Sequence, residues 1–218
     1  MKNVIAFTAL AASLISGAAI AASTTELKVT GVIKPPACAA TIAGGGTVDY
    51  GTIPVTSLNK TSPTKLATKE VPFSFSCDAS TKIALKFTDN KASTKVTGLG
   101  GPVGAIFETT MMGLGAASGK NIGAYQVTLK QGSFTADGAV VDTLNSPDQG
   151  ASWYKGDLGT FYTDRWLSWG KTGTTTPVSV KTVSGTLSVT AVIDKTDNLV
   201  LISDVPLDGS GTIEVVYL

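Results

Sequence analysis

Apolar residues alternate with polar residues along several short runs of this chain, and a period of two is the pattern of a half-buried β-strand. In one run Phe73, Phe75 and Cys77 are separated by single serines, so we expect Cys77 to point inward with the two phenylalanines. The clearest runs are 71–77, 83–87, 125–129 and 187–193. Turn-forming Gly, Asp, Asn and Pro residues lie between them, and helical periodicity is nearly absent. The pattern predicts an all-β fold, an antiparallel β-sandwich.

The first 21 residues have the features of a secretory signal peptide. Lys2 precedes an apolar stretch, and Ala19-Ile20-Ala21 forms an A-x-A cleavage site. The alternative is an uncleaved membrane anchor, but Thr, Ser and Gly interrupt the stretch, which falls short of the roughly 20 strongly apolar residues that span a bilayer. We therefore expect residues 1–21 to be removed, and residues 22–218 to form one domain without a membrane span, in the periplasm or at the cell surface.

Cys38 and Cys77 are the two cysteines of the chain. In an oxidising compartment an even number of cysteines forms disulfides by default. We predict one bridge, which joins the first strand to the strand at 71–76. The alternative is a redox or metal-binding pair, but the sequence has neither C-x-x-C spacing nor a third soft ligand.

The composition excludes several classes of function. The chain has no histidine, which removes the Ser-His-Asp and Cys-His catalytic systems and the common zinc sites. Without Lys2 the 17 basic residues become 16 and equal the 16 acidic ones, so nothing attracts nucleic acid or anionic lipid. We expect no enzymatic activity, no cofactor and no metal. The best enzymatic alternative is a glycosidase with Asp157 and Asp164 as its carboxylates.

The segment 153–169 contains all 3 tryptophans and the one arginine of the chain. One interpretation is a platform for a glycan or another flat ligand, because aromatic rings and an arginine stack on such molecules. Its residues would be Trp153, Tyr154, Arg165, Trp166 and Trp169. The interpretation that we prefer is an aromatic-rich insertion that packs its own small core or covers a sheet edge, with the tryptophans buried. The glycine-rich segment 98–119 is either a long loop or a short helix.

Both ends of the mature chain resemble the subunits of chaperone-usher pili. Residues 29–38 resemble the first pilin strand, which is apolar, contains a glycine and leads into a cysteine. Residues 211–218 resemble the last pilin strand, with tyrosine as the penultimate residue. From Leu27 to Asn90 the chain is similar to an uncharacterised family of fimbrial-like periplasmic proteins of Gram-negative bacteria. The motifs that carry this similarity are Asp49-Tyr50-Gly51, Ser57-Leu58-Asn59 and Phe75-Ser76-Cys77-Asp78.

This resemblance implies an immunoglobulin-like sandwich of the pilin type that lacks its last strand. A periplasmic chaperone, and then the N-terminal extension of the next subunit, would fill the groove by adding a strand to a free sheet edge. The implied function is a fimbrial-like structural or adhesive subunit that is assembled by donor-strand complementation, with a chaperone, an outer-membrane usher and neighbouring subunits as partners. The implied contact residues are Leu27, Val29, Ile213, Val215, Val216, Tyr217 and Leu218.

Alternation also predicts the faces of the C-terminal strand. Ile213, Val215 and Tyr217 should face the core, whereas Thr212 and Glu214 should face outward.

Two details differ from the pilin pattern. Val205 and Pro206 lie where pilins usually keep a glycine, about fourteen residues before the end. If the first strand begins at Val29, only residues 22–28 precede it, fewer than the roughly 10 residues of a groove-filling strand. The alternative function is therefore a stand-alone periplasmic or secreted pilin-like module that binds a ligand on its aromatic platform.

Overall fold

The computed structural model describes residues 23–34, 36–156 and 159–218. The predicted signal peptide, residues 1–21, lies outside the described residues. The chain divides into two compact units at Lys34. We call residues 23–34 the tail and residues 36–218 the domain, and each is described by itself.

The tail has no regular secondary structure. Its large apolar side chains are almost fully accessible, with exposed fractions of 88% for Leu27, 88% for Val29, 93% for Val32 and 100% for Ile33. The prediction that a first strand begins at Val29 is therefore wrong. The first strand begins at Cys38, directly after Pro36 and Ala37, because no described strand pairs with residues 29–34 and proline has no N–H for a sheet ladder.

The domain is an antiparallel β-sandwich, and β13 is the central strand of its first sheet. One side of β13 pairs with β3 and β2, and the other side pairs with β8 and β9. The strands of this sheet are β1 (Cys38–Ile42), β2 (Thr64–Lys65), β3 (Lys69–Thr81), β5 (Met112–Gly113), β8 (Gly123–Leu129), β9 (Thr135–Ala136) and β13 (Val180–Ile193).

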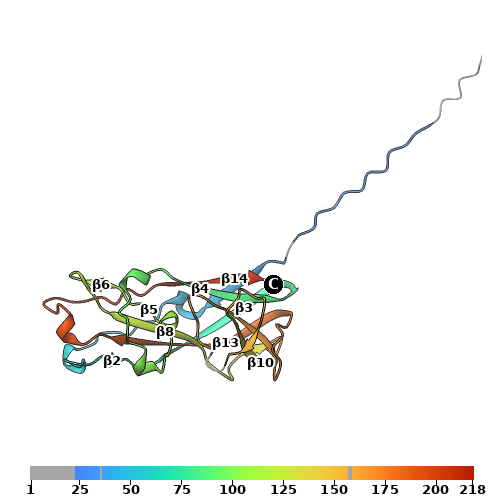
Figure 1. Cartoon of the computed structure of the whole chain (residues 1–218). Helices are drawn as coiled ribbons and strands as arrows, with labels where there is room; N and C mark the ends of the chain where they lie inside the picture. The colour runs from blue at the N-terminus through green and yellow to red at the C-terminus, as the bar shows by residue number, and fades with distance from the viewer. Residues whose placement is uncertain (1–22, 35, 157–158) are drawn as a thin grey trace, which may run out of the picture. The chain divides into compact units, whose positions relative to one another are not determined.

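The second sheet packs against the first, and the β9–β10 hairpin connects the two. Its strands, in spatial order, are β11 (Tyr154–Lys155), β10 (Ala139–Ser146), β12 (Trp166–Lys171), β4 (Ile83–Asp89) and β14 (Gly211–Tyr217). In Figure 1 β4 and β14 lie along one layer of the domain, and β13 and β2 lie along the other. A separate hairpin consists of β6 (Ala116–Ala117) and β7 (Lys120–Asn121).

Short 3-10 helices occur in the connections. They are η1 (Ala43–Gly46), η2 (Val55–Ser57), η3 (Ala92–Thr94), η4 (Gly101–Val103), η5 (Glu108–Thr110) and η6 (Thr196–Asn198). The segment 98–119 is thus mostly a long connection, which contains the 3-10 turns η4 and η5 and the two-residue strands β5 and β6. Met111 and Met112 fix it to the domain, because both side chains are fully buried.

The core lies between the two sheets and consists of the inward residues of the alternating runs. Phe73 and Phe75 of β3 are 1% and 2% exposed, and Leu85 of β4 is inaccessible. Phe134 contacts both Phe73 and Trp169, with ring centroids 6.3 and 5.8 Å apart. Gly185 of β13 lies under Phe134, where an added Cβ would come within 2.6 Å of the ring. A side chain at this position would displace the central aromatic cluster.

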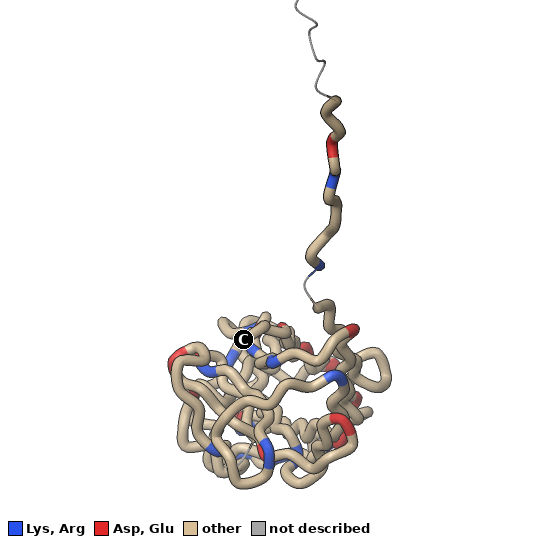
Figure 2. The backbone as a smooth tube through the Cα atoms, turned by 90° about the vertical axis from the view of Figure 1, so that its right-hand side faces the viewer, with Lys and Arg blue, Asp and Glu red and all other residues tan. Residues whose placement is uncertain are grey.

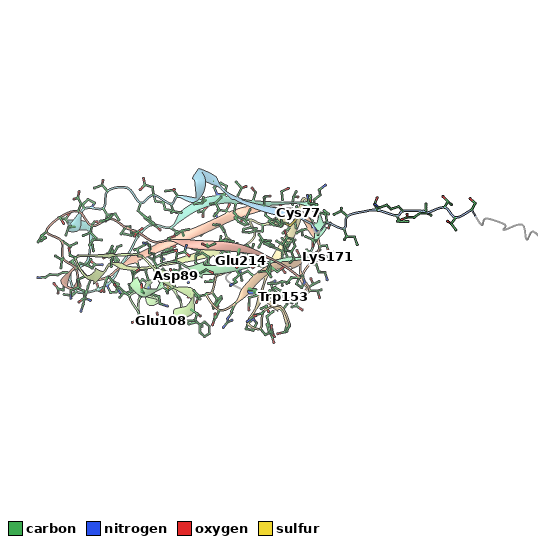
Figure 3. The ribbon with its side chains drawn as sticks, turned by 90° about the horizontal axis from the view of Figure 1, so that it is seen from above. Cys77, Asp89, Glu108, Trp153, Lys171 and Glu214 are labelled. Carbon is green, nitrogen blue, oxygen red and sulfur yellow. A yellow bond between two sulfur atoms is a disulfide. The ribbon has the colours of Figure 1, made fainter. Side chains whose placement is uncertain are left out.

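The predicted disulfide is confirmed. Cys38 and Cys77 are directly opposite in the β1–β3 ladder, with their Cα atoms 4.0 Å apart. Cys77 is 3% exposed, so the inward direction predicted from its place in the alternation is also confirmed. The bridge attaches the edge strand β1 to the longer β3 near one end of the domain (Figure 3).

Reduction of this bridge should destabilise the mature protein by about 2 to 4 kcal/mol, because the bridge closes a long loop in the unfolded chain. Urea unfolding with and without a phosphine reductant measures the difference. The double variant Cys38→Ala/Cys77→Ala is the control, and its stability should not respond to reductant. A wild-type free energy of unfolding that is unchanged by complete reduction would contradict the prediction.

Candidate functional site

Two strands form free edges on the same side of the sandwich. Among the described strands, β1 pairs with β3 alone and β14 pairs with β4 alone. The Leu218 N–H donates to the Lys82 carbonyl, and the Asn90 N–H donates to the Ser210 carbonyl. Hydrogen-bonded pairs alternate in an antiparallel ladder, so the even-numbered residues of β14 bond to β4. The backbone groups of the odd-numbered residues 211, 213, 215 and 217 consequently point away from β4.

Upstream of β14, a segment that is not part of a regular ladder also places apolar side chains against the domain. Leu199, Leu201, Val205 and Leu207 are half-buried, in the same odd-numbered phase as Ile213. The alternation in the sequence is too irregular to identify this segment, because Val200 and Ile202 are apolar at even-numbered positions. In addition, Ser203 and two glycines occupy odd-numbered positions.

Between the two edges the core is open to solvent. A groove with a volume of about 390 Å³ has Ile42 of β1 on one wall and Ile213 of β14 on the other. Phe87, Tyr125 and Leu187 form its apolar floor. Burial and the nearby Asp89 carboxylate raise the pKa of the Tyr125 hydroxyl well above its usual value, so this hydroxyl stays neutral even at alkaline pH.

The opening continues toward the far end of the domain as a second hollow of about 730 Å³. The two hollows share Thr47, Val48, Tyr50 and Leu207, so they adjoin. Together they follow residues 42–58 on one side and residues 199–213 on the other. We call this combined feature the edge groove.

Tyr50 fixes one wall of the edge groove to the central strand. Its hydroxyl donates to the Val189 carbonyl at 2.9 Å and accepts from the Ala191 N–H at 3.0 Å. These backbone groups lie where β13 passes from its pairing with β3 to its pairing with β2. Burial raises the pKa of Tyr50, and the bond from Ala191 lowers it by less. The neutral Tyr50 hydroxyl therefore attaches this wall to the backbone of β13 where the partner strand changes from β3 to β2.

The other end of the groove, next to the disulfide, is closed. The Cys38 N–H of β1 donates to the Tyr217 hydroxyl of β14 at 3.0 Å. Ile213 and Val215 contact the core as predicted, and Thr212 and Glu214 are exposed. The Tyr217 hydroxyl is directed toward β1 of the other sheet, in agreement with the predicted phase, but the residue is 48% exposed and is not part of the core. The hydrogen bond to β1 holds its ring at the rim.

The remaining predicted contact residues are partly accessible. Val216 is half-buried, and Leu218 is 44% exposed. On the outer face of β14, Glu214 forms an ion pair with Lys86 at 3.3 Å, and this exposed pair contributes little to stability. Figure 2 shows the charged residues dispersed over the domain, without a continuous patch of either sign on the face in view.

The aromatic segment does not form one platform. Trp169 is 1% exposed and packs on Phe134 in the core, so its proposed role as a ligand contact is wrong. Arg165 lies over Tyr162 and Phe107, with its guanidinium carbon 4.2 and 5.4 Å from the two ring centroids. Arg165 therefore contacts the loop between η4 and η5, which contains Phe107 and is distant in sequence.

Trp153 and Trp166 both lie beside Gly150, in a loop close to the C-terminal residue Leu218. The Trp153 indole N–H donates to the Gly150 carbonyl at 3.1 Å. A Cβ added to Gly150 would lie 3.3 Å from the Trp166 ring and 3.4 Å from Leu218. Asp148 orders this loop by accepting from Ser152 and Ser146, and these hydrogen bonds, above all that from the Ser152 hydroxyl, lower its pKa to about 2. Tyr154 is 55% exposed on β11.

Burial of the tryptophans was predicted, and it holds in full for Trp169 alone. Trp153 and Trp166 are half-buried. The five proposed platform residues thus have different environments. Trp169 lies in the core, Arg165 lies in a cation–π stack, and Tyr154 lies on the surface of β11. Trp153 and Trp166 lie beside the loop that contains Gly150.

The described residues contain no group of three or more acidic or cysteine side chains placed to hold a metal ion. Of the two carboxylates considered for glycosidase chemistry, Asp164 is exposed and lies 4.0 Å from Arg165, and Asp157 lies outside the described residues. None of the helices in the described part of the chain has the length and apolar character needed to cross a bilayer.

Comparisons with known proteins identify the family. Residues 27–126 match the family described as protein of unknown function (DUF1120). Protein GltF of Escherichia coli (strain K12) is 31% identical, over 96% of this chain and 94% of that protein. The chain belongs to the DUF1120 family. The uncharacterized protein YhcF of the same organism is 28% identical, over 88% of this chain and 89% of that protein.

The different environments of the tryptophans predict different fluorescence. Trp169→Phe should remove blue-shifted emission that acrylamide quenches poorly, because this indole is buried beside Phe134. Trp153→Phe and Trp166→Phe should each remove a more strongly quenched component. Acrylamide quenching of the three variants measures this order. Equal quenching constants for all three would contradict it.

Proposed function

We propose that this protein is an exported, fimbrial-like structural subunit that is assembled by donor-strand complementation. The observation that carries the proposal is the edge groove, an apolar opening between the unpaired edges of β1 and β14. Unpaired edges are templates for an additional strand. A strand placed there would bond to the outward backbone groups of β14 and place alternate side chains on the apolar floor.

The tail of this chain has the pattern of such a strand. Leu27, Val29 and Ile33 are in the same phase, so an extended tail presents all three on one face, with Gly31 between them. These apolar side chains have exposed fractions of 88 to 100%. Moving each of them into an apolar groove is favourable by about 1.5 to 3 kcal/mol.

The length of the tail also supports the proposal. We had expected an extension of residues 22–28, which would be too short to fill a groove. Because β1 begins at Cys38, the described tail has the 12 residues from Ser23 to Lys34. An extended strand of this length spans roughly 40 Å, enough for a full groove-filling strand.

A chain with both features exposes an apolar groove and an apolar strand at once. Exposed sheet edges and apolar strands aggregate when nothing covers them. The proposed function therefore includes a periplasmic chaperone that covers the groove first, and an outer-membrane usher that exchanges it for the tail of a neighbouring subunit. The corresponding location is the periplasm and then the cell surface.

Val29→Asp should reduce assembly of the mature chain by at least about tenfold, because a carboxylate would enter the apolar groove without a partner. Val32→Asp is the matched control, with the same substitution at a tail valine of opposite phase and similar exposure. It should reduce assembly much less. Size-exclusion chromatography and electron microscopy of the purified mature chain measure assembly, and both variants should keep the thermal unfolding midpoint of the domain.

Equal effects of the two substitutions would contradict the phase assignment. A wild-type chain that remains monomeric at high concentration and binds no synthetic peptide of residues 23–34 would contradict the proposed function.

A further inference from the structure

We infer that Tyr217 closes one end of the edge groove and thereby determines where an added strand is bound. On this inference the accepting segment is 199–213, and it stops before Val215. The inference rests on the proposed function, since it concerns the register of the strand that the groove would accept. It also changes the implied contact surface of the C-terminal strand, which was placed on Ile213, Val215, Val216, Tyr217 and Leu218.

The Tyr217 hydrogen bond joins the two free edges of the sandwich. Its donor is held firmly, because Cys38 is cross-linked to Cys77, and Ala37 exchanges hydrogen bonds with the Asp78 backbone and side chain. On the acceptor side, the neighbouring Leu218 N–H donates to the carbonyl of Lys82, the residue directly before β4. Both partners are therefore anchored in their own sheets, and a strand that passed between them would have to break the bond.

The shape of the groove agrees with this closure. Gly211 and Ile213 line it, whereas Val215, Val216, Tyr217 and Leu218 line neither of its two hollows. Leu199 and Leu207, at positions farther from the C-terminus, do line it. The accessible apolar surface thus follows the upstream part of the edge, although the unpaired backbone groups continue to Tyr217.

A closed end fixes the register of the incoming strand, whereas a uniform edge would allow the strand to slide. A shift of one residue would move every apolar side chain of an incoming strand to the opposite face, and a shift of two would leave part of the groove empty. With Tyr217 bonded to Cys38, a strand cannot slide toward the C-terminus. Without the hydroxyl, the edges at residues 215–217 can separate and become part of the binding site.

The test uses the full mature chain carrying Val29→Asp, so that its own tail does not compete, with and without Tyr217→Phe. The probes are two synthetic peptides of residues 23–34 with a photoreactive phenylalanine at the position of either Ser23 or Lys34. Cross-linked residues are located by mass spectrometry. Tyr154→Phe is the matched control, because it removes the hydroxyl of an exposed tyrosine outside the groove.

With Tyr217 present, adducts should fall within 42–58 and 199–213 for both peptides, and Tyr154→Phe should give the same map. With Tyr217→Phe, at least one peptide should also give adducts within 215–218. Adducts within 215–218 when Tyr217 is present, or identical maps for Tyr217→Phe and its parent, would overturn the inference and leave the proposed function intact. The absence of adducts with every protein would contradict the proposed function itself.

Near-ultraviolet circular dichroism of each variant verifies that the fold is retained. The result in the parent protein tests the inference even if Tyr217→Phe does not fold, because binding confined to 199–213 and binding that extends to 215–218 produce different maps.

Discussion

The accessible groove of this protein exists because no described strand lies between the edge strands β1 and β14 of the sandwich. β13 is paired on both sides along most of its length, and β4 lies between β12 and β14. On the side where β1 and β14 approach each other, the described chain provides no strand between them. The core is therefore enclosed on the remaining sides and accessible here. Three features lie along this opening: the Tyr50 bonds to β13, the Tyr217 bond to β1, and the half-buried side chains of Leu199, Leu201, Val205 and Leu207.

Local pattern was sufficient to predict most of the sheets. Phe73, Phe75 and Cys77 alternate without interruption, and the structure buries all three. The run at 187–193 likewise lies within β13. Such runs are predictable because alternate side chains of a strand fall on opposite faces. The fold class and the disulfide were thus accessible from the sequence alone.

The start of β1 and the extent of the groove wall depend on pairing between distant segments, and a local pattern does not contain that information. Val29 and Ile33 share one phase, as in a strand, but no described strand lies beside them, so both side chains are accessible in the tail. Residues 199–207 alternate poorly, because Val200 and Ile202 are apolar at even-numbered positions and Ser203 is polar at an odd one. The aromatic segment was misjudged for a related reason: proximity along the chain does not place Trp169 and Trp153 in one environment, because β12 carries the former into the core.

The separation of the tail from the domain has a consequence for how the protein can change over evolutionary time. Residues 23–34 belong to a different compact unit from the sandwich, and their apolar side chains are not part of its core. Substitutions in the tail therefore leave the stability of the fold nearly untouched, and under the proposed function they act on association alone. Substitutions in the groove floor, such as at Phe87 or Leu187, change the core itself and, under the same proposal, association as well. If the proposed function holds, partner preference can diverge quickly through the tail while the sandwich stays under strong selection.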